Sequence, residues 1–138
     1  MLSEDEVLGV VGITEMVVRP GDTSVAIGIG DLPIIAPSLL INLMEHAAIL
    51  SLDLYLEPGE TTIPISVEFI SLSPAGIGTS LRATSRVIEI SGKELTFECE
   101  VYESERQIAA ALIKRSAVER VSFLARTAAL HLIQNEKS

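Results

Sequence analysis

The chain has 138 residues, 48% of them hydrophobic and 4% aromatic, so its length and composition predict one domain, residues 1–138, with an aliphatic core. A formal net charge of -9, without a basic stripe, excludes nucleic-acid binding from the expected functions. The only cysteine, Cys99, excludes an internal disulfide. The acidic start lacks the regions of a signal peptide, and polar residues interrupt the apolar runs, so we expect a cytoplasmic protein that does not span a membrane.

The first predicted element is a strand over residues 9–18, which are rich in β-branched residues and carry a single charge, Glu15. Pro20 and Gly21 end this strand, and a loose connection follows as far as Pro33. The GIG sequence within this connection is not typical of a phosphate loop, because the lysine and the further glycine of that motif are missing.

A long helix is predicted from Pro37, which suits a first helical turn, to about residue 56, just before the Pro58-Gly59 pair. Its span of about twenty residues corresponds to roughly 30 Å. One side of the helical wheel carries the polar residues Ser38, Asn42, Glu45, His46 and Asp53. Because the other positions are almost all Leu, Ile, Met or Ala, we expect the helix to be wrapped by a sheet or pressed against another subunit.

Four strands are then predicted over residues 61–72, 79–89, 93–103 and 107–117, followed by a helix over 121–134. In the first of these strands, period-two spacing predicts that Ile63, Ile65, Val67 and Phe69 share one face. Pro64 predicts that the same strand lies at a sheet edge or contains a bulge.

The second and third of these strands form a hairpin whose register is predicted by its apolar residues. A three-residue loop over 90–92 with a left-handed glycine places all the apolar groups on one face and pairs Val87 with Leu95. On the opposite face this register pairs Arg82 with Glu100 as an exposed ion pair.

The order of elements is a strand, a long apolar helix and four antiparallel strands joined by short turns. This order indicates an α+β fold with the helix on one face of a five-stranded sheet, plus a C-terminal helix. A sheet that curls around the helix accounts for the apolar circumference of the helix. The polar side of the helix must then face a dimer interface or a pocket. Cys99 is expected to point inwards between Phe97 and Val101 as an inert buried thiol.

Five segments occur in a recognisable order and spacing between about Val18 and Arg126: VVRPGDTSVAIGIGDLPIIAPS, LINLMEHAA, LEPGE, ISLSPAGIGTSLRATSRVIEISGKELTFECEVYE and FLAR. Together they resemble the hotdog-fold thioesterases, in particular the branch of the fluoroacetyl-CoA thioesterases. The resemblance implies a hotdog fold and a homodimer with its two long helices side by side. It also implies that an acyl-CoA thioester binds in pockets at the subunit interface, without a cofactor.

In this family a Thr, a Glu and a His cooperate in hydrolysis, and the resemblance assigns each position separately. The Glu of the LME motif is Glu45. The Thr position, eight residues earlier, is Pro37, with Ser38 beside it, and the His position is Phe69. A family Gly, seven residues before that His, corresponds to Thr62. One of the three reactive groups therefore matches, and the resemblance implies an altered pocket.

Each polar candidate on the helix has two interpretations. Glu45 is either a general base or nucleophile, or a carboxylate bonded to a partner helix. Ser38 either replaces the family Thr or caps the helix. Asn42 either orients Ser38 or Glu45 or hydrogen-bonds across the interface. His46 either assists as an acid or base or is an interface or surface residue, and no metal-ligand spacing follows it. The candidate substrate-binding residues are Pro37, Asn42, His46, Thr62 and Phe69.

A basic cluster late in the chain, made by Lys114, Arg115 and Arg120, is the candidate contact for the phosphates of a CoA-like ligand. Its alternative interpretation is a solvated face that balances the many glutamates.

The first functional hypothesis is a thioesterase-like protein that binds an acyl-CoA thioester at a dimer interface and hydrolyses it with Glu45 as base or nucleophile. The alternative is a catalytically degenerate acyl-CoA-binding module, which Pro37 and Phe69 favour. A third hypothesis is a structural dimer without a ligand. A hotdog dehydratase is disfavoured, because no Asp and His pair occurs at a plausible site.

Overall fold

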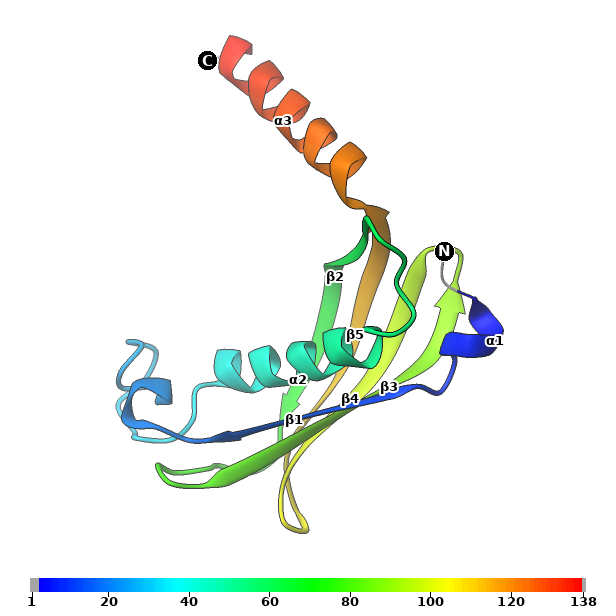
Figure 1. The fold of residues 1–138 in the computed structure, drawn as a ribbon. Coiled ribbons are helices and arrows are strands. Elements are labelled where there is room, and N and C mark those ends of the chain that lie inside the picture. Colours follow the sequence, from blue (N-terminus) through cyan, green and yellow to red (C-terminus); the bar gives the residue numbers. More distant parts are fainter. Residues whose placement is uncertain (1–2, 138) are drawn as a thin grey trace.

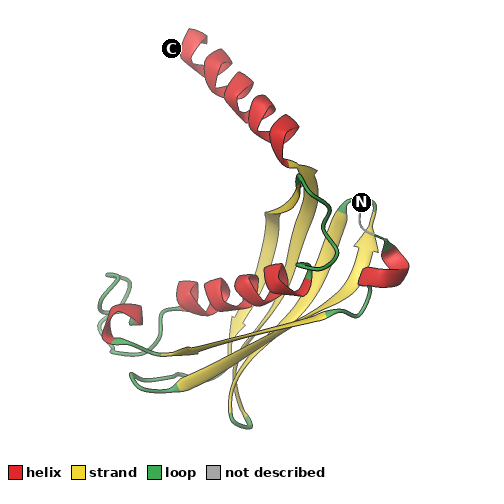
Figure 2. Cartoon of the chain, in the orientation of Figure 1, coloured by secondary structure: helices red, strands yellow, loops and turns green. Residues whose placement is uncertain are grey.

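The computed structural model describes residues 3–137. Its elements in chain order are α1 (Glu4–Val7), β1 (Val11–Val17), the 3-10 turn η1 (Pro20–Asp22), α2 (Pro37–Ser51), β2 (Glu60–Ser71), β3 (Ser80–Ser91), β4 (Glu94–Glu103), β5 (Arg106–Glu119) and α3 (Arg120–Lys137). The strands form one antiparallel sheet in the order β1-β3-β4-β5-β2, and it curves around α2 (Figures 1 and 2). This arrangement confirms the predicted α+β hotdog class with a central helix and a C-terminal helix.

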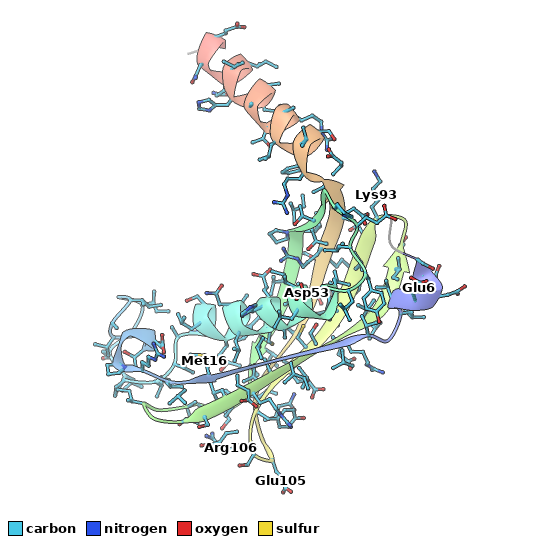
Figure 3. All side chains as sticks on the ribbon, viewed as in Figure 1. Glu6, Met16, Asp53, Lys93, Glu105 and Arg106 are labelled. Carbon is cyan, nitrogen blue, oxygen red and sulfur yellow. The ribbon has the colours of Figure 1, made fainter. Side chains whose placement is uncertain are left out.

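The central helix is shorter than the sequence indicates, with 15 residues instead of about twenty. Its last turn tightens, because the N–H of Leu52 bonds to the carbonyl of Ile49 at 3.1 Å, three residues back. A further turn then closes between Tyr55 and Leu52 at 2.9 Å. Asp53, the last member of the predicted polar side, therefore lies beyond the helix and is exposed (Figure 3).

The core lies between one side of α2 and the concave face of the sheet, where alternate residues of β3, β4 and β5 are buried. Its largest fully buried side chains include Leu40, Met44, Leu52, Leu81, Leu95, Phe97, Ile108 and Ile113. The Thr14 hydroxyl donates to the carbonyl of Leu43 at 2.9 Å and ties β1 to the helix. The opposite side of α2 is not covered by residues 3–137, since Ile49 and Leu50 remain 41% and 39% exposed.

The hairpin of β3 and β4 has the predicted buried face but not the predicted register. Ser91 pairs with Glu94, so the turn has two residues, and Gly92 is left-handed with φ 61°. A bulge between Val87 and Glu89 restores the alternation, and Val87 then faces Phe97 instead of Leu95. The exposed ion pair between these strands is consequently Arg86 with Glu98 at 3.2 Å, not Arg82 with Glu100.

Edge strand β2 carries the irregularity that Pro64 predicts, a bulge between Pro64 and Ser66. The extra residue reverses the side-chain alternation, so that Thr62 and Pro64 lie on the same concave face as Phe69. Ile63 faces the opposite side, where it pairs with Ser116. The expectation that Ile63 shares a face with Phe69 was therefore wrong, because simple period-two counting does not include a bulge.

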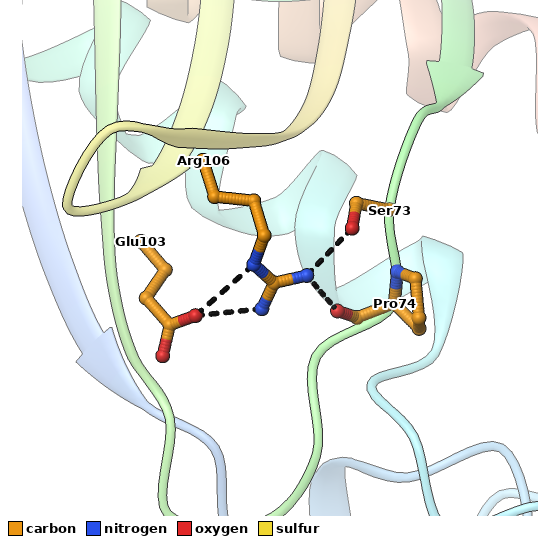
Figure 4. A network of polar contacts seen from close by, with 4 residues as sticks. All are labelled: Ser73, Pro74, Glu103 and Arg106. Carbon is orange, nitrogen blue, oxygen red and sulfur yellow. Dashed lines mark hydrogen bonds and ion pairs between the residues drawn. The ribbon is translucent and has the colours of Figure 1, made fainter.

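The turn between β4 and β5 is tied to the segment that follows β2 (Figure 4). Arg106 donates to the carboxylate of Glu103 at 2.6 Å, to the hydroxyl of Ser73 at 2.5 Å and to the carbonyl of Pro74 at 2.7 Å. The next residue of that segment, Ala75, accepts a hydrogen bond from the N–H of Ile35 at 2.8 Å. Because Ile35 comes just before α2, this contact network positions the start of the central helix.

The C-terminal helix extends away from the sheet, as Figure 1 shows. It begins at Arg120, where the carboxylate of Glu119 accepts a hydrogen bond from the N–H of Ser122 at 2.6 Å. Leu124 and Leu130 on this helix are 59% and 67% exposed. Among the described residues, no helix combines the length and apolarity that crossing a bilayer requires.

Candidate functional site

The uncovered side of α2 carries the polar residues that the sequence singles out. Ser38, Asn42 and His46 are exposed, and Glu45 is partly buried. They lie on this side because Leu40, Leu43, Met44, Ala47 and Ala48 turn towards the sheet. The helix therefore presents its one carboxylate near its middle, on the side that the sheet leaves open.

Glu45 is paired with an arginine from the sheet. Its Oε1 lies 3.0 Å from Nη1 of Arg115, whose side chain is 7% exposed, against 23% for Glu45. Arg115 comes from β5, between Ile113 and Ala117 on the concave face. Burial lowers the pKa of the Arg115 guanidinium, and the Glu45 carboxylate opposes that shift. An arginine keeps its charge in proteins, so the contact is an ion pair.

The same guanidinium donates two hydrogen bonds to Thr62 on edge strand β2. Nε of Arg115 donates to the Thr62 hydroxyl at 2.9 Å, and Nη2 donates to the Thr62 carbonyl at 3.0 Å. This two-point contact uses one edge of the guanidinium, while Nη1 on the other side holds Glu45. Arg115 thus links α2, β2 and β5, and it places Glu45 and Thr62 on either side of one planar group.

Glu45 keeps one oxygen and Thr62 one hydroxyl proton that no described residue hydrogen-bonds. Within residues 3–137, Oε2 of Glu45 has no hydrogen-bond partner, and the Thr62 hydroxyl accepts from Arg115 but donates to no other residue. A cavity of about 590 Å³ lies over Glu45. Its lining includes Glu15, Met16, Asn42, His46, Pro64 and Arg115. The arrangement offers a carboxylate oxygen of Glu45 to a molecule bound in this cavity.

Arg115 does not lie in the basic cluster in which the sequence predicts it. The proposed basic cluster does not form, because alternation along β5 sends Lys114 outwards and Arg115 inwards, while Arg120 starts α3. A pattern in the sequence could have predicted the inward position of Arg115. Alternate residues put this arginine on an otherwise apolar face, which is made by Ala109, Ala111, Ile113 and Ala117. A buried arginine needs an acid, and Glu45 is the carboxylate of the central helix.

The positions at which the family carries a Thr and a His, Pro37 and Phe69, do not form a second hydrolytic arrangement here. Pro37 and Ser38 form the first turn of α2, seven or more residues before Glu45, which is about 10 Å along the helix axis. Ser38 does not cap the helix, because the cap position is Ala36 and no side chain bonds to it. Phe69 lies on the concave face opposite Ala111 and packs against the core.

Cys99 lies inside the sheet, as expected. Its side chain is fully buried, and its thiol donates to the Ser85 hydroxyl at 3.4 Å. Burial raises the pKa of the Cys99 thiol to about 11, so the reactive thiolate is scarce near neutral pH. Among the described residues, no group of His, Cys, Asp and Glu side chains has the arrangement of a metal site.

Comparison with known proteins gives a consistent result. The model of the fluoroacetyl-CoA-specific thioesterase family matches residues 18–121. The solved structure of the fluoroacetyl-CoA thioesterase is similar, with a TM-score of 0.80, 20% identity and coverage of 88% of this chain and 94% of that one.

Two further solved structures share the fold. A thioesterase superfamily member from Thermus thermophilus has a TM-score of 0.85, 22% identity and coverage of 94% of this chain and 96% of its own. A hot-dog-like protein from Thermanaerovibrio acidaminovorans has a TM-score of 0.83, 19% identity and coverage of 91% and 95%. No curated protein matches the sequence. The family match confirms the resemblance noted in the sequence, and the chain belongs to the fluoroacetyl-CoA-specific thioesterase family.

Proposed function

We propose that this protein is an acyl-CoA thioesterase in which Glu45 acts as base or nucleophile. The observation that carries the proposal is the ion pair between Glu45 and Arg115 at a cavity, where no residue among 3–137 hydrogen-bonds to Oε2 of Glu45. Two related structures support the ligand class: variants of the fluoroacetyl-CoA thioesterase are described in complex with acetyl-CoA and with fluoroacetate and CoA. A thioesterase-like activity follows from the family, and the role of Glu45 is the part that needs testing.

The chemistry requires a nucleophile, a proton acceptor and a leaving group that accepts the proton. Oε2 of Glu45 removes a proton from a water molecule while the water oxygen bonds to the thioester carbon. The C–S bond then breaks, and the proton passes from Glu45 to the departing CoA sulfur. In the alternative route Oε2 itself attacks the thioester carbon, the C–S bond breaks, and CoA leaves as a thiolate that takes a proton from solvent. Water then hydrolyses the resulting anhydride, which restores the Glu45 carboxylate and releases the acid. Arg115 orients the carboxylate in both routes by holding Oε1 at 3.0 Å.

We further propose that the working unit is a homodimer with the pocket at its interface. The uncovered side of α2 exposes Ile49 and Leu50, and the chain beyond it exposes Leu54 at 91%. Edge strand β2 exposes Ile65 and Ile70 at 50% and 55%. Long edge strands with apolar side chains are normally covered in native proteins, and a second copy would cover this edge and the open side of α2 together.

A binding module without hydrolysis is the second candidate. Pro37 has no hydroxyl and no N–H, and Phe69 presents only a ring to the concave face, so neither replaces the reactive group of the family. The cavity over Glu45 would then serve to hold an acyl-CoA rather than to cleave it. This candidate predicts saturable binding with no release of free thiol.

The two candidates separate in one assay. Wild type, Glu45→Gln and Glu98→Gln are incubated with a panel of acyl-CoAs, and thiol release is followed by a chromogenic disulfide. Glu98 lies on β4, half-exposed and paired with Arg86, so its substitution is a matched loss of one carboxylate away from the cavity. We expect Glu45→Gln to lower kcat/KM at least about 100-fold and Glu98→Gln to leave it unchanged. Equal turnover by wild type and Glu45→Gln would exclude Glu45 as the reactive group.

The dimer is tested on the same preparations. Sedimentation equilibrium across the concentrations used in the assay should give twice the mass of one chain. A monomer that turns over substrate at full rate would remove the interfacial part of the proposal and leave the chemistry intact.

A further inference from the structure

The C-terminal helix α3 is hardly buried among residues 3–137. Only Phe123 is half-buried, and every other side chain described on this helix is exposed. The exposed side chains include large apolar groups that are each at least half exposed: Val121, Leu124, Leu130, Leu132 and Ile133. A helix in a folded protein owes most of its stability to the packing of such side chains, so α3 needs a surface that residues 3–137 of the same chain do not supply. The family model ends at residue 121, so the family match does not say what that surface is.

A second uncovered apolar surface is the loop over residues 24–34, which lies between η1 and α2. The loop is closed at its base, where the N–H of Ser24 donates to the carbonyl of Ile34 at 2.9 Å. Its outer part carries apolar side chains that are each at least half exposed: Val25, Ile29 and Leu32. Apolar side chains that gather on a protein surface commonly mark an interface with another molecule.

These two surfaces lie at opposite ends of edge strand β2. Helix α3 follows directly after Glu119, the last residue of β5, which pairs with Glu60 at the start of β2. The 24–34 loop lies at the other end, where it borders a cavity of about 280 Å³ together with Ser71 and Leu72. The 12 residues of β2 span roughly 40 Å, so the helix and the loop of one chain lie far apart (Figure 1).

A two-fold axis brings the helix of one copy to the loop of the other. In the proposed homodimer the second copy covers edge strand β2 and the open side of α2. For both α2 helices to lie on the same face of the joined sheet, the axis must run perpendicular to the sheet, and the two β2 strands then pair antiparallel. The Glu60 end of each strand consequently lies next to the Ser71 end of the other. Each α3 therefore begins beside the 24–34 loop of the second copy.

We propose that α3 of each copy packs its apolar side chains against the 24–34 loop of a second copy of this chain. The proposal rests on the homodimer of the proposed function and names two segments that hold it together. Because a two-fold interface is isologous, the contact occurs twice in each dimer. It covers both exposed apolar surfaces at once, which accounts for their presence in one chain.

The charges of the two segments are complementary. In a chain with a net charge of -9, α3 carries Arg120 and Arg126 against one described acid, Glu136. The 24–34 loop carries Asp31 as its only charged residue. The helix and the loop therefore have opposite charges, which favours their contact, whereas two α3 helices side by side would bring like charges together.

Thiol cross-linking of the full chain tests this contact. The natural Cys99 is fully buried, so a thiol placed on the surface reacts selectively. We compare Leu32→Cys, Leu124→Cys and the double variant after treatment with a flexible bismaleimide, which is quenched before a denaturing gel. We expect the double variant to give a covalent dimer. Each single variant should keep the mass of one chain, because the two loops, like the two helices, lie at opposite ends of the paired strands.

Other neighbours of α3 give different products. A covalent dimer from Leu124→Cys alone would show that two α3 helices pair with each other, and it would overturn the proposal. An internal cross-link that leaves the double variant at the mass of one chain would overturn it too, because the helix would then contact its own loop. If sedimentation equilibrium shows a dimer and the double variant does not cross-link, the α3 contact is overturned and the homodimer stands. If sedimentation shows a monomer, both proposals fail.

The affinity of the dimer provides an independent measurement. Leu124→Gln keeps a good helix former and replaces the apolar contact with an amide. We expect the Kd of the dimer to rise about 100-fold, because the substitution removes an apolar contact twice in each dimer. Ile13→Gln is the matched control, since Ile13 is 53% exposed against 59% for Leu124 and lies on β1 at the other edge of the sheet. Equal Kd values for Leu124→Gln and Ile13→Gln would overturn the proposal.

Discussion

Gly12 is the point at which strand β1 comes closest to the central helix. A Cβ placed on Gly12 would lie 2.0 Å from the carbonyl oxygen of Ala47 and 2.8 Å from the backbone nitrogen of Ser51. These two atoms belong to successive turns of the same stretch of α2, so an alanine would press on the helix backbone itself. Backbone cannot rotate away as a side chain does, and Gly12→Ala therefore forces α2 and β1 apart.

The size of this effect follows from the distances. Real Cβ contacts start at about 3 Å, so a separation of 2.0 Å requires a shift of about 1 Å or more. A gap of that size forfeits about a quarter to a half of the dispersion energy of each contact around it. Overpacking of a core costs about 1–3 kcal/mol, and the rigid backbone here places Gly12→Ala at the upper end. The loss of unfolded-state entropy offsets this by only about 0.4–1 kcal/mol. We expect a net loss of about 2–3 kcal/mol in the free energy of unfolding.

Thermal and urea unfolding followed by circular dichroism measure this loss. With an unfolding entropy of about 2.1 cal/mol/K per residue, 138 residues shift Tm by about 3.4 °C per kcal/mol, so Gly12→Ala should lower Tm by roughly 7–10 °C. Gly21→Ala is the control, because nothing lies within 4 Å of the Cβ that it adds. A Tm for Gly12→Ala within 2 °C of that control would refute the close approach of β1 to α2.

Two other predictions concern stability. Burial raises the pKa of Cys99 from 9.0 to about 11, so between these values the folded state holds a proton that the unfolded state releases. The free energy of unfolding should then be unaffected below pH 9 and should fall by up to ~3 kcal/mol towards pH 11. Urea unfolding of wild type and Cys99→Ala at pH 8 and pH 11 checks this, and an equal fall in both proteins would contradict it. Arg115→Ala should cost about 2–3 kcal/mol, because it leaves Glu45 half-buried without its partner, whereas Arg86→Ala on the exposed face should cost under about 1 kcal/mol. Similar losses in these two arginine variants, measured by the same unfolding curves, would show that burial of the pair does not matter.

The order of elements could be predicted from local signals, and the family from the resemblance of five segments in their order and spacing. The helix begins at Pro37 because a proline suits a first turn, and the alternation in β3, β4 and β5 puts apolar side chains on one face whatever the exact register. Glu45 stood out because it is a lone carboxylate in an apolar helix. These are properties of near neighbours in the chain, which is the range over which sequence patterns carry information.

The structure decided what depends on irregularities and on contacts between distant residues. The bulges after Val87 and Pro64 each insert one residue, which shifted the hairpin register in one strand and turned Thr62 to the concave face in the other. Arg115 lies 70 residues from Glu45 along the chain, and their pairing appears only when β5 passes beneath α2.

The sequence by itself therefore determined the order of elements and the one acidic residue of the central helix, because periodicity and turn residues act locally. The hotdog architecture and the family were indicated by the resemblance of whole segments to a known family. Tertiary structure alone determined what that acid touches. A buried arginine must find an acceptor, and the curvature of the sheet decides which carboxylate and which hydroxyl are within its reach.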